Sequence, residues 1–208
     1  MHRDDLGCYH VLHWLTGLLQ PRTYLEVGVR EGGSLCSVLG SEPEIVAFAS
    51  TCLDDGRTHL TDDIIQRIHE GYTSRDPTMQ LYLFDNWSYD GGDGGHDRVT
   101  RLLDDGFHHH CYALYDGDSK DTLPPFLDTM KAPLDLVFVD GDHTLDGATA
   151  DLENLAGRFK VLVMHDLVHP QHSYLEAVFT RYVRSHGYPS VIVGRRAMGT
   201  GVAFNMEG

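Results

Sequence analysis

The segment Leu134–His143, which reads LDLVFVDGDH, decides the fold. Its first six residues form a largely apolar run that is too short for an ordinary helix, so they predict a strand buried on both faces. The run ends abruptly in charged residues. Because ligands bind at the carboxyl ends of strands in an open parallel sheet, we expect Asp140, Asp142 and His143 to lie at a binding crevice.

A helix is predicted immediately after this acidic turn. Ala148, Leu152 and Leu155 recur at the spacing of one helix face, which can pack back onto the sheet. Asp146 stands in the first turn, where the helix dipole favours a carboxylate. The strand, the turn and the helix together form half of an α/β crossover unit.

The rest of the chain repeats this alternation. Strands are predicted at residues 23–29, 44–49, 79–84, 111–115, 160–164, 190–193 and 201–204, and helices at 6–19, 34–39, 62–69, 98–103, 123–130 and 174–185. The pattern predicts a single α/β domain over residues 1–208, with a doubly wound, mostly parallel sheet and a C-terminal antiparallel hairpin. Residues 88–97 are rich in glycine and charge, which predicts a mobile loop over the crevice.

Composition limits the classes of function. The 208 residues, 41% of them hydrophobic, suit one domain with a real core. A formal net charge of -15 argues against a nucleic-acid partner, and no apolar run approaches the roughly 20 residues that cross a bilayer. The first five residues include two acids and no apolar stretch, which predicts a cytoplasmic location. The apolar face of the helix at 6–19 is expected to cover the sheet or a partner subunit of a homo-oligomer.

A glycine loop follows the first predicted strand, with the spacing Glu26-x-Gly28-x-x-x-Gly32-x-Ser34. A strand, a glycine loop and a helix start together present backbone N–H groups to a ligand. A dinucleotide fingerprint, G-x-G-x-x-G, would match Gly28 and Gly33 but needs its middle glycine where Arg30 stands. A bulky residue at that position prevents the close approach of a pyrophosphate. Taken alone, the loop is equally compatible with an ordinary tight turn.

The same spacing resembles motif I of class I S-adenosylmethionine-dependent methyltransferases. The resemblance implies a seven-stranded Rossmann-like methyltransferase sheet. It also implies that the loop of Gly28, Gly32 and Ser34 wraps the amino-acid end of the cofactor, while Glu26 holds the ammonium group. A side chain at Gly28 is then expected to occupy the space of the cofactor.

Later segments extend this resemblance in the expected order. Residues 115–119, YDGDS, look like the family segment that meets the adenine, which assigns Asp118 and Ser119 to cofactor binding. Residues 138–143, FVDGDH, with Asp151-Leu152 and the VMHD of residues 163–166, resemble the core of a metal-dependent, small-molecule O-methyltransferase branch. On this reading Asp140 also contributes to the cofactor site.

Families of this type usually place an acid at the end of the second strand, where it accepts both ribose hydroxyls. The strand predicted at 44–49 does not end in an acid. We choose Asp85, which follows the strand predicted at 79–84, and keep Asp54 or Asp55 as alternatives.

Asp140 and Asp166 follow two strands that the resemblance places side by side. Without a cation, two neighbouring carboxylates repel each other and one takes up a proton. Oxygen ligands with room for water suit Mg²⁺ best, so we predict a divalent metal here. His165 is the third candidate ligand, with a packed core histidine as the alternative.

His143 is the candidate general base, because an imidazole titrates near neutral pH and need only remove one proton from the attacking hydroxyl. Asp142 is expected to orient His143 or to add a metal ligand. The alternative for both residues is capping of the helix that follows, for which Thr144 competes.

These residues predict an enzyme that transfers a methyl group from S-adenosylmethionine to a hydroxyl of a small, oxygen-rich acceptor, such as a sugar, a phenol or a secondary metabolite. Two other classes remain open. One is a metal-dependent hydrolase or hydroxylase-like relative that uses the acid and histidine cluster without methyl transfer. The other is a module that binds the cofactor and has lost catalysis.

Overall fold

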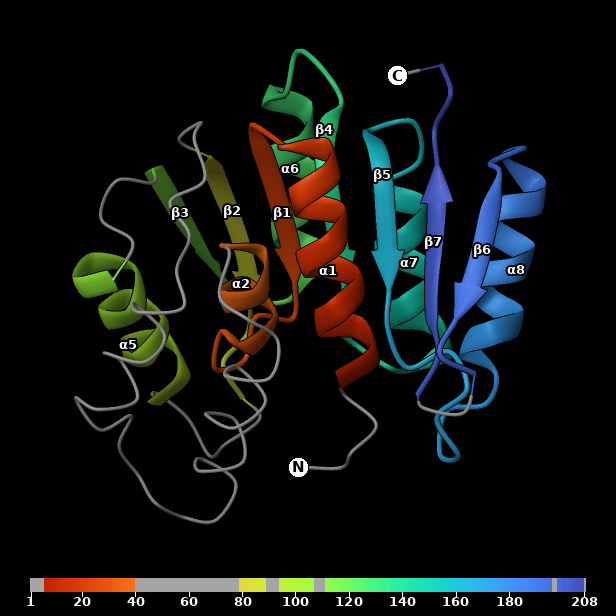
Figure 1. Cartoon of the computed structure of the whole chain (residues 1–208), viewed down its shortest axis with the longest axis horizontal. Coiled ribbons are helices and arrows are strands. Elements are labelled where there is room, and N and C mark those ends of the chain that lie inside the picture. The colour runs from red at the N-terminus through yellow and green to blue at the C-terminus, as the bar shows by residue number, and fades with distance from the viewer. Residues whose placement is uncertain (1–5, 40–78, 89–93, 107–110, 196–197, 208) are drawn as a thin grey trace.

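The computed structural model describes residues 6–39, 79–88, 94–106, 111–195 and 198–207. It contains a seven-stranded sheet in the order β3-β2-β1-β4-β5-β7-β6, shown in Figure 1. The first five strands of this order are parallel, and β7 runs antiparallel to both β5 and β6. The predicted doubly wound sheet with its closing antiparallel hairpin is therefore confirmed. The strands are β1 (Thr23–Val27), β2 (Gln80–Asp85), β3 (Cys111–Asp116), β4 (Leu134–Val139), β5 (Phe159–Met164), β6 (Ser190–Val193) and β7 (Thr200–Phe204).

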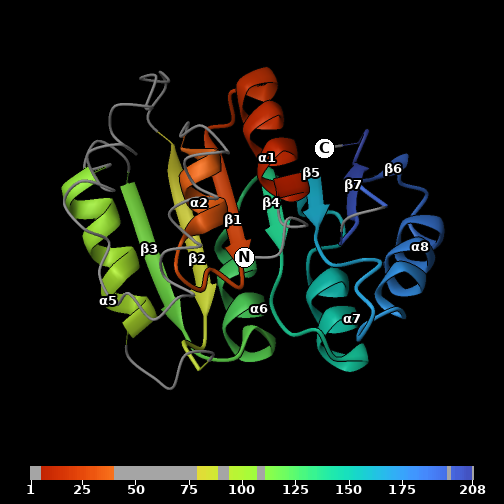
Figure 2. The same ribbon diagram turned by 60° about the horizontal axis from the view of Figure 1, so that its bottom comes forward.

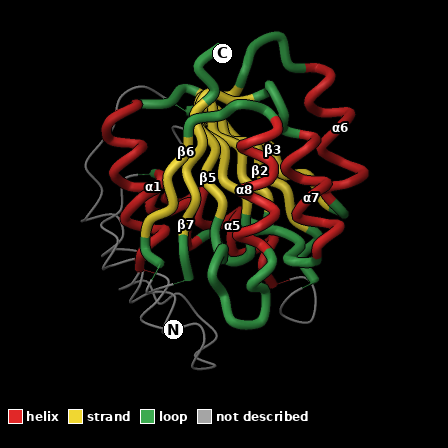
Figure 3. The backbone as a smooth tube through the Cα atoms, turned by 90° about the vertical axis from the view of Figure 1, so that its right-hand side faces the viewer, coloured by secondary structure: helices red, strands yellow, loops and turns green. Residues whose placement is uncertain are grey.

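Helices cover both faces of the sheet, as Figures 2 and 3 show. Side chains of α1, α2 and α5 form one buried cluster with the sheet, and side chains of α6, α7 and α8 form the other. No helix of the described residues combines the length and the apolarity that crossing a membrane demands. The helices are α1 (Leu6–Leu19), α2 (Gly33–Val38), α5 (Gly94–Arg101), α6 (Ser119–Thr129), α7 (Leu145–Asn154) and α8 (Leu175–Ser185), and the π-helical η1 (Leu102–Gly106) follows α5.

Strand β4 lies between β1 and β5, as its apolar sequence predicts. Five of its six residues are buried, and Asp135 is the exception. The Asp135 carboxylate accepts hydrogen bonds from the backbone N–H groups of Arg22 and Thr23 and from Lys160 Nζ, at 2.8, 3.1 and 2.7 Å. The one charged residue of the strand is thereby paired at the edge of the sheet opposite the predicted crevice.

The loop predicted at residues 88–97 needs correction at its end, because α5 begins at Gly94. Gly95 lies against Trp87: a Cβ atom at this position would come within 3.2 Å of the indole ring. This packing, together with Asp97 in the first turn, stabilises a helix start that glycine alone disfavours. Residues 89–93 lie outside the described residues, and so do the strand and helix predicted at 44–49 and 62–69.

Gly28 joins β1 to the glycine loop where the chain passes the turn after β4. Its φ of +88° is in the left-handed region, and a Cβ atom there would lie 2.2 Å from the carbonyl oxygen of Asp140. The space beside Gly28 is therefore filled by backbone, and the expectation that a side chain would enter the cofactor space is wrong. Glycine is needed here so that two turns can touch.

Replacing Gly28 with alanine is expected to lower the free energy of unfolding by roughly 3 kcal/mol or more, through left-handed strain and the clash with Asp140 together. Gly157 is the matched control. It has a φ of +73°, and a Cβ atom added there would meet nothing within 4 Å. Gly157→Ala should therefore cost only the conformational strain of about 1–2 kcal/mol. Equal midpoints for the two variants in urea denaturation would contradict the close approach.

Candidate active site

A cleft of about 820 Å³ opens at the carboxyl edge of the parallel strands. This volume is in the range of small-molecule sites, and the position is the one predicted for an open α/β sheet. Most of the site residues selected from the sequence line it. They are Gly28, Ser34, Asp85, Asp118, Ser119, Asp140, Asp142, His143, His165 and Asp166, whereas Glu26 and Gly32 do not reach the lining.

Glu26 lies beneath the glycine loop with no exposed surface. Its carboxylate accepts a hydrogen bond from Tyr24 Oη at 2.7 Å and a second, short one from Ser34 Oγ. Burial raises the pKa of Glu26 to about 8, although both hydroxyl donors oppose the shift. The structure thus shows Glu26 supporting the loop from below, and a contact with a cofactor ammonium group stays a prediction.

The glycine loop is anchored by backbone contacts. Gly28 N–H donates to the carbonyl of Phe84 at 2.9 Å, and Gly32, the N-cap residue of α2, is in the left-handed conformation, with φ of +83°. Arg30 also has a positive φ, of 55°, and its N–H donates to Asp85 Oδ2 at 2.7 Å. The loop and the end of β2 therefore form one connected surface of the cleft.

Asp85 ends β2, the strand that pairs with β1 in parallel. Its second oxygen, Oδ1, accepts the N–H of Trp87 at 2.6 Å. Each carboxylate oxygen keeps a further lone pair that can accept a ligand hydroxyl. This is the position in the sheet at which the ribose acid was predicted, and the alternatives Asp54 and Asp55 lie outside the described residues.

Asp118 and Ser119 lie at the N-terminus of α6, and both line the cleft. Asp118 is the N-cap residue, and its carboxylate accepts the N–H of Lys120 at 2.9 Å. Ser119 Oγ donates to Asp151 Oδ1 at 2.6 Å, so a hydroxyl of the cleft lining is attached to a buried residue of α7. Sequence reasoning placed the two cleft residues here and did not foresee this partner.

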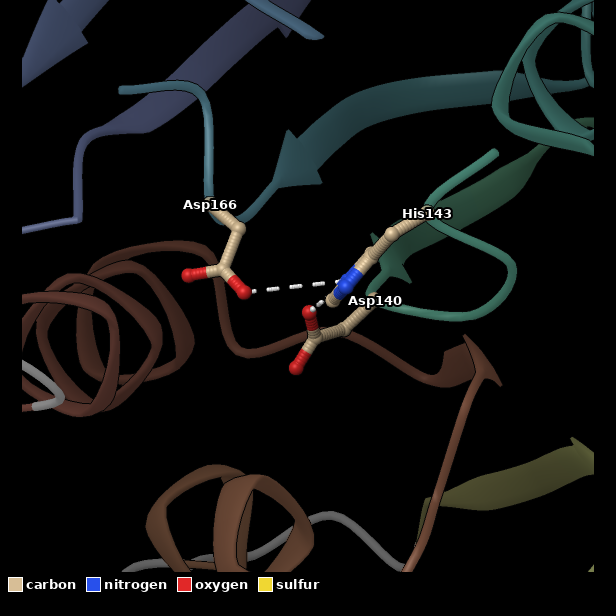
Figure 4. A group of neighbouring side chains, drawn as sticks. All are labelled: Asp140, His143 and Asp166. Atoms are coloured by element: carbon tan, nitrogen blue, oxygen red, sulfur yellow. Dashed lines mark hydrogen bonds and ion pairs between the residues drawn. The ribbon is translucent and has the colours of Figure 1, made fainter. Parts of the chain in front are cut away.

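Asp140, His143 and Asp166 form a compact group at the ends of β4 and β5. Each offers one ligand atom, and all three atoms lie within 4.8 Å of one another. Figure 4 shows the His143 ring directed toward both carboxylates: His143 Nε2 lies 3.1 Å from Asp140 Oδ1 and 3.7 Å from Asp166 Oδ2. The predicted pairing of Asp140 with Asp166 is present, with His143 as the third member.

His165 lies behind this group and is only 4% exposed. Its Nδ1 is 3.3 Å from Asp166 Oδ1 and 3.6 Å from Asp140 Oδ1. Its Nε2 is buried and finds no hydrogen-bond partner among the described residues. The imidazole within the three-residue group is thus His143 rather than His165, which the sequence singled out as the third metal ligand.

Asp142 points away from His143. Its carboxylate accepts the N–H of Thr144 at 2.9 Å and the hydroxyl of Thr144 at 3.0 Å, and Lys120 Nζ lies at 3.4 Å. Thr144 itself caps α7, because its hydroxyl accepts the N–H of Gly147. The orienting role expected of Asp142 therefore falls to other groups: Asp140 contacts the His143 ring, and Tyr174 Oη donates to the His143 carbonyl at 2.5 Å.

The charges of the group are unequal. Burial favours the protonated form of Asp140, but the positive charge of His165 and the hydrogen bond to His143 outweigh it and hold the pKa of Asp140 well below its usual range. Burial raises the pKa of Asp166, and the charge of Asp140 adds to this. The hydrogen bond to Asp140 raises the pKa of His143, although burial opposes the shift. In the absence of another cation, the histidines thus compensate the carboxylates.

Comparison with known proteins defines the class of the chain. Residues 25–167 match the family model described as a methyltransferase domain, which is more than half of the chain. No curated protein sequence matches. The chain belongs to this methyltransferase family, and it is a class I S-adenosylmethionine-dependent methyltransferase by family and fold.

Solved structures of similar fold agree with this assignment. The chain is 19% identical to CalS11, a TDP-rhamnose 3'-O-methyltransferase of calicheamicin biosynthesis, with a TM-score of 0.62, covering 98% of this chain and 79% of that one. It is 18% identical to the O-methyltransferase TomG from Streptomyces achromogenes in complex with S-adenosylmethionine, with a TM-score of 0.59 and coverages of 94% and 78%. At these identities the likeness establishes the fold.

The structure also brings in residues that sequence reasoning did not select. His169 and His172 lie in the segment between β5 and α8 and line the cleft beside His143. The ring centroids of His143 and His172 are 5.1 Å apart, and those of His169 and His172 are 5.0 Å apart. Their spacing in the sequence is not a recognisable motif, so only the fold reveals that they form one wall of the cleft.

Replacing Glu26 with glutamine is expected to remove a pH dependence of folding. Between pH 4.5, the ordinary value for glutamate, and about 8, the folded protein retains a proton that the unfolded chain releases. The stability of the wild type should fall across this window, by about 1.4 kcal/mol per pH unit at most, and level off above it. Thermal unfolding of Glu26→Gln measured at several pH values should lack this slope.

The exposed Glu207 provides the control for this measurement, because solvent surrounds its side chain. Glu207→Gln should keep the wild-type slope. If Glu26→Gln kept it as well, the assignment of the pH dependence to the buried carboxyl beneath the glycine loop would be wrong.

Proposed function

We propose that this methyltransferase transfers the methyl group of S-adenosylmethionine to a hydroxyl of a small, oxygen-rich acceptor, such as a sugar, a phenol or a secondary metabolite, with the help of a divalent metal. The observation that carries the proposal is the group of Asp140, His143 and Asp166 in the same cleft as the glycine loop. A cofactor bound at the glycine loop and an acceptor bound at the acid–imidazole group would therefore lie in the same cleft.

The cofactor would extend along the carboxyl ends of β1, β2 and β3. The glycine loop from Gly28 to Ser34, with Gly32 at the start of α2, would receive its amino-acid end, since the loop presents backbone N–H groups there. Asp85 has oxygen lone pairs for the ribose hydroxyls, and Asp118 and Ser119 line the adenine end. Asp140, at the centre of the cleft, would lie between donor and acceptor.

The donor set fits a metal ion. Asp140 and Asp166 would supply carboxylate oxygens, and the closeness of the His143 and His165 imidazoles to these carboxylates supports a site that attracts positive charge. Carboxylates with space for water suit Mg²⁺, and the neighbouring imidazoles also suit a transition metal. A bound divalent cation would polarise an acceptor hydroxyl and lower its pKa.

His143 is the proposed general base. Its Nε2–H would donate to the ionised carboxylate of Asp140, which leaves Nδ1 as the nitrogen that would take up the proton, and Tyr174 Oη donates to the backbone carbonyl of His143. Removal of one proton from the acceptor oxygen as the C–O bond forms is the task that an imidazole performs near neutral pH. His169 and His172 line the cleft next to His143. Because the cofactor would lie along β1, β2 and β3, the acceptor would bind beside these histidines.

The remaining expectations are part of the same proposal. A small-molecule acceptor suits an internal cleft, and a net charge of -15 argues against nucleic acid. A cytoplasmic enzyme is consistent with these features. Trp14 and Leu18 of α1 are each 64% exposed, so this helix is where a homo-oligomer would form.

Asp140→Asn and Asp166→Asn are each expected to weaken Mn²⁺ binding by roughly tenfold or more, because an amide oxygen lacks the charge that a divalent cation requires. Isothermal titration of the protein with Mn²⁺ alone measures this without knowledge of the acceptor. Asp142→Asn is the control and should bind as the wild type does, because that carboxylate serves Thr144 and Lys120. A wild type that binds no Mn²⁺ would exclude the metal.

His143→Ala is expected to bind S-adenosylhomocysteine and Mn²⁺ within about threefold of the wild type while turnover falls roughly 10²- to 10⁴-fold, the usual contribution of a general base. Turnover is measured as transfer of a labelled methyl group to the acceptor found in a panel of glycosides and phenols. His10→Ala, an exposed histidine of α1, is the control. Loss of Mn²⁺ affinity in His143→Ala would instead make this residue a metal ligand.

A further inference from the structure

Asp151, in the second half of α7, is an ionisable residue for which the proposed reaction has no use. Its side chain has no exposed surface. One oxygen, Oδ1, accepts the Ser119 hydroxyl at 2.6 Å, whereas Oδ2 finds no hydrogen-bond partner among the described residues. Burial raises the pKa of Asp151 to about 6, although the hydrogen bond from Ser119 opposes this. At neutral pH the protein therefore holds a buried and incompletely paired carboxylate, an arrangement that lowers stability.

The carboxylate lies between two turns of the cleft. Ser119 begins α6 after β3, and Gly141 follows β4. A Cβ atom at Gly141 would lie 3.3 Å from Asp151 Oδ2, so this turn rests directly on the carboxylate. Strands β3 and β4 are separated in the sheet by β2 and β1, and strand pairing therefore does not hold the two turns together. Asp151 connects them from below.

A second connection between the same turns lies at the surface. Lys120 Nζ is 3.3 Å from Asp118 Oδ2 and 3.4 Å from Asp142 Oδ2, and all three side chains are at least one-third exposed. Exposed ion pairs contribute little, because water screens them and the long side chains lose entropy. The buried hydrogen bond from Ser119 is the contact that can fix the distance between the turns.

We propose that Asp151 is a positioning residue that fixes the turn of Asp118 and Ser119 against the turn of Gly141 and thereby sets the affinity of the cleft for the adenosine part of the cofactor. The inference rests on the proposed placement of the adenine at α6. A purely structural residue would be apolar here, as Ala148, Leu152 and Leu155 of the same face are. An incompletely paired carboxyl that lowers stability beside a binding cleft is typical of a functional constraint.

The test is calorimetric binding of S-adenosylhomocysteine to two variants. Asp151→Ala removes the acceptor of the Ser119 hydroxyl and should weaken binding roughly tenfold, as expected for the loss of a buried hydrogen bond to a charged group. Asp151→Asn retains an oxygen acceptor and should bind within about threefold of the wild type. Turnover at saturating cofactor should stay within about threefold in both variants, so that the KM for S-adenosylmethionine changes and kcat does not.

Thermal unfolding at pH 8 separates positioning from stability. Asp151→Asn removes the buried charge and should raise the melting temperature above that of the wild type without improving cofactor affinity. If Asp151→Ala does not fold, Asp151→Leu, which also lacks a hydrogen-bond acceptor but fills the space, takes its place and should weaken binding roughly tenfold. Ser119→Ala combined with the variant that lacks the acceptor should bind no more weakly than Ser119→Ala alone, because both changes remove one contact. Losses that add in this double variant, or equal weakening in Asp151→Asn and in the variant without an acceptor, would overturn the proposal.

Asp85→Asn distinguishes the failure of this inference from the failure of the proposed function. If Asp85→Asn weakens binding of S-adenosylhomocysteine and Asp151→Ala does not, only the positioning role of Asp151 is refuted. If neither variant changes the affinity, the cofactor does not lie along β2 and α6, and the proposed placement is refuted with it.

Discussion

The close approach of Gly28 to the backbone of Asp140 sets the geometry of the cleft. Asp140 N–H donates to the carbonyl of Val27 at 2.8 Å, and Gly28 N–H donates to the carbonyl of Phe84, so the ends of β4, β1 and β2 are joined by backbone alone. The glycine loop begins at one side of this junction and the acid–histidine group at the other. Because Gly28 and Asp140 meet through their backbones, main-chain packing sets how close the start of the loop lies to the turn that carries the group.

Burial acts on several carboxyl groups in this small region, and the neighbours decide the result. Glu26 has only neutral hydroxyl donors, and its pKa rises to about 8. Asp151 has one hydroxyl donor and a smaller rise, whereas the imidazoles beside Asp140 more than offset its burial. Residue type alone would give all three the same charge. The fold therefore distributes charge across the cleft, with the ionised carboxylate at the centre and protonatable ones beneath its walls.

The sequence allowed prediction of those features that depend on local pattern and on parallel-sheet geometry. The buried run of β4 and the helix after it follow from these rules, whereas the meeting of Asp140 with Asp166 follows from the strand order that the family resemblance implies. The directions of Asp142 and His143 could not be predicted, because one turn of backbone decides which side chain caps the helix and which faces the carboxylates. The helix start at Gly94 depends on packing against Trp87, and the partner of Asp151 is 32 residues away in the chain. Such tertiary contacts leave no periodic signal.

The order of the last strands has a consequence for how the protein is made. Strand β7 lies between β5 and β6, so β5 gains its second neighbour only from residues 200–204, which are synthesised after β6. Until then β5 presents an unpaired edge of apolar residues, a surface that favours pairing with other chains. The site residues that follow β4 and β5 therefore precede, in the chain, the strand that closes the sheet beside them. Insertion of β7 covers the open edge of β5 and thereby removes a surface that could pair with other chains.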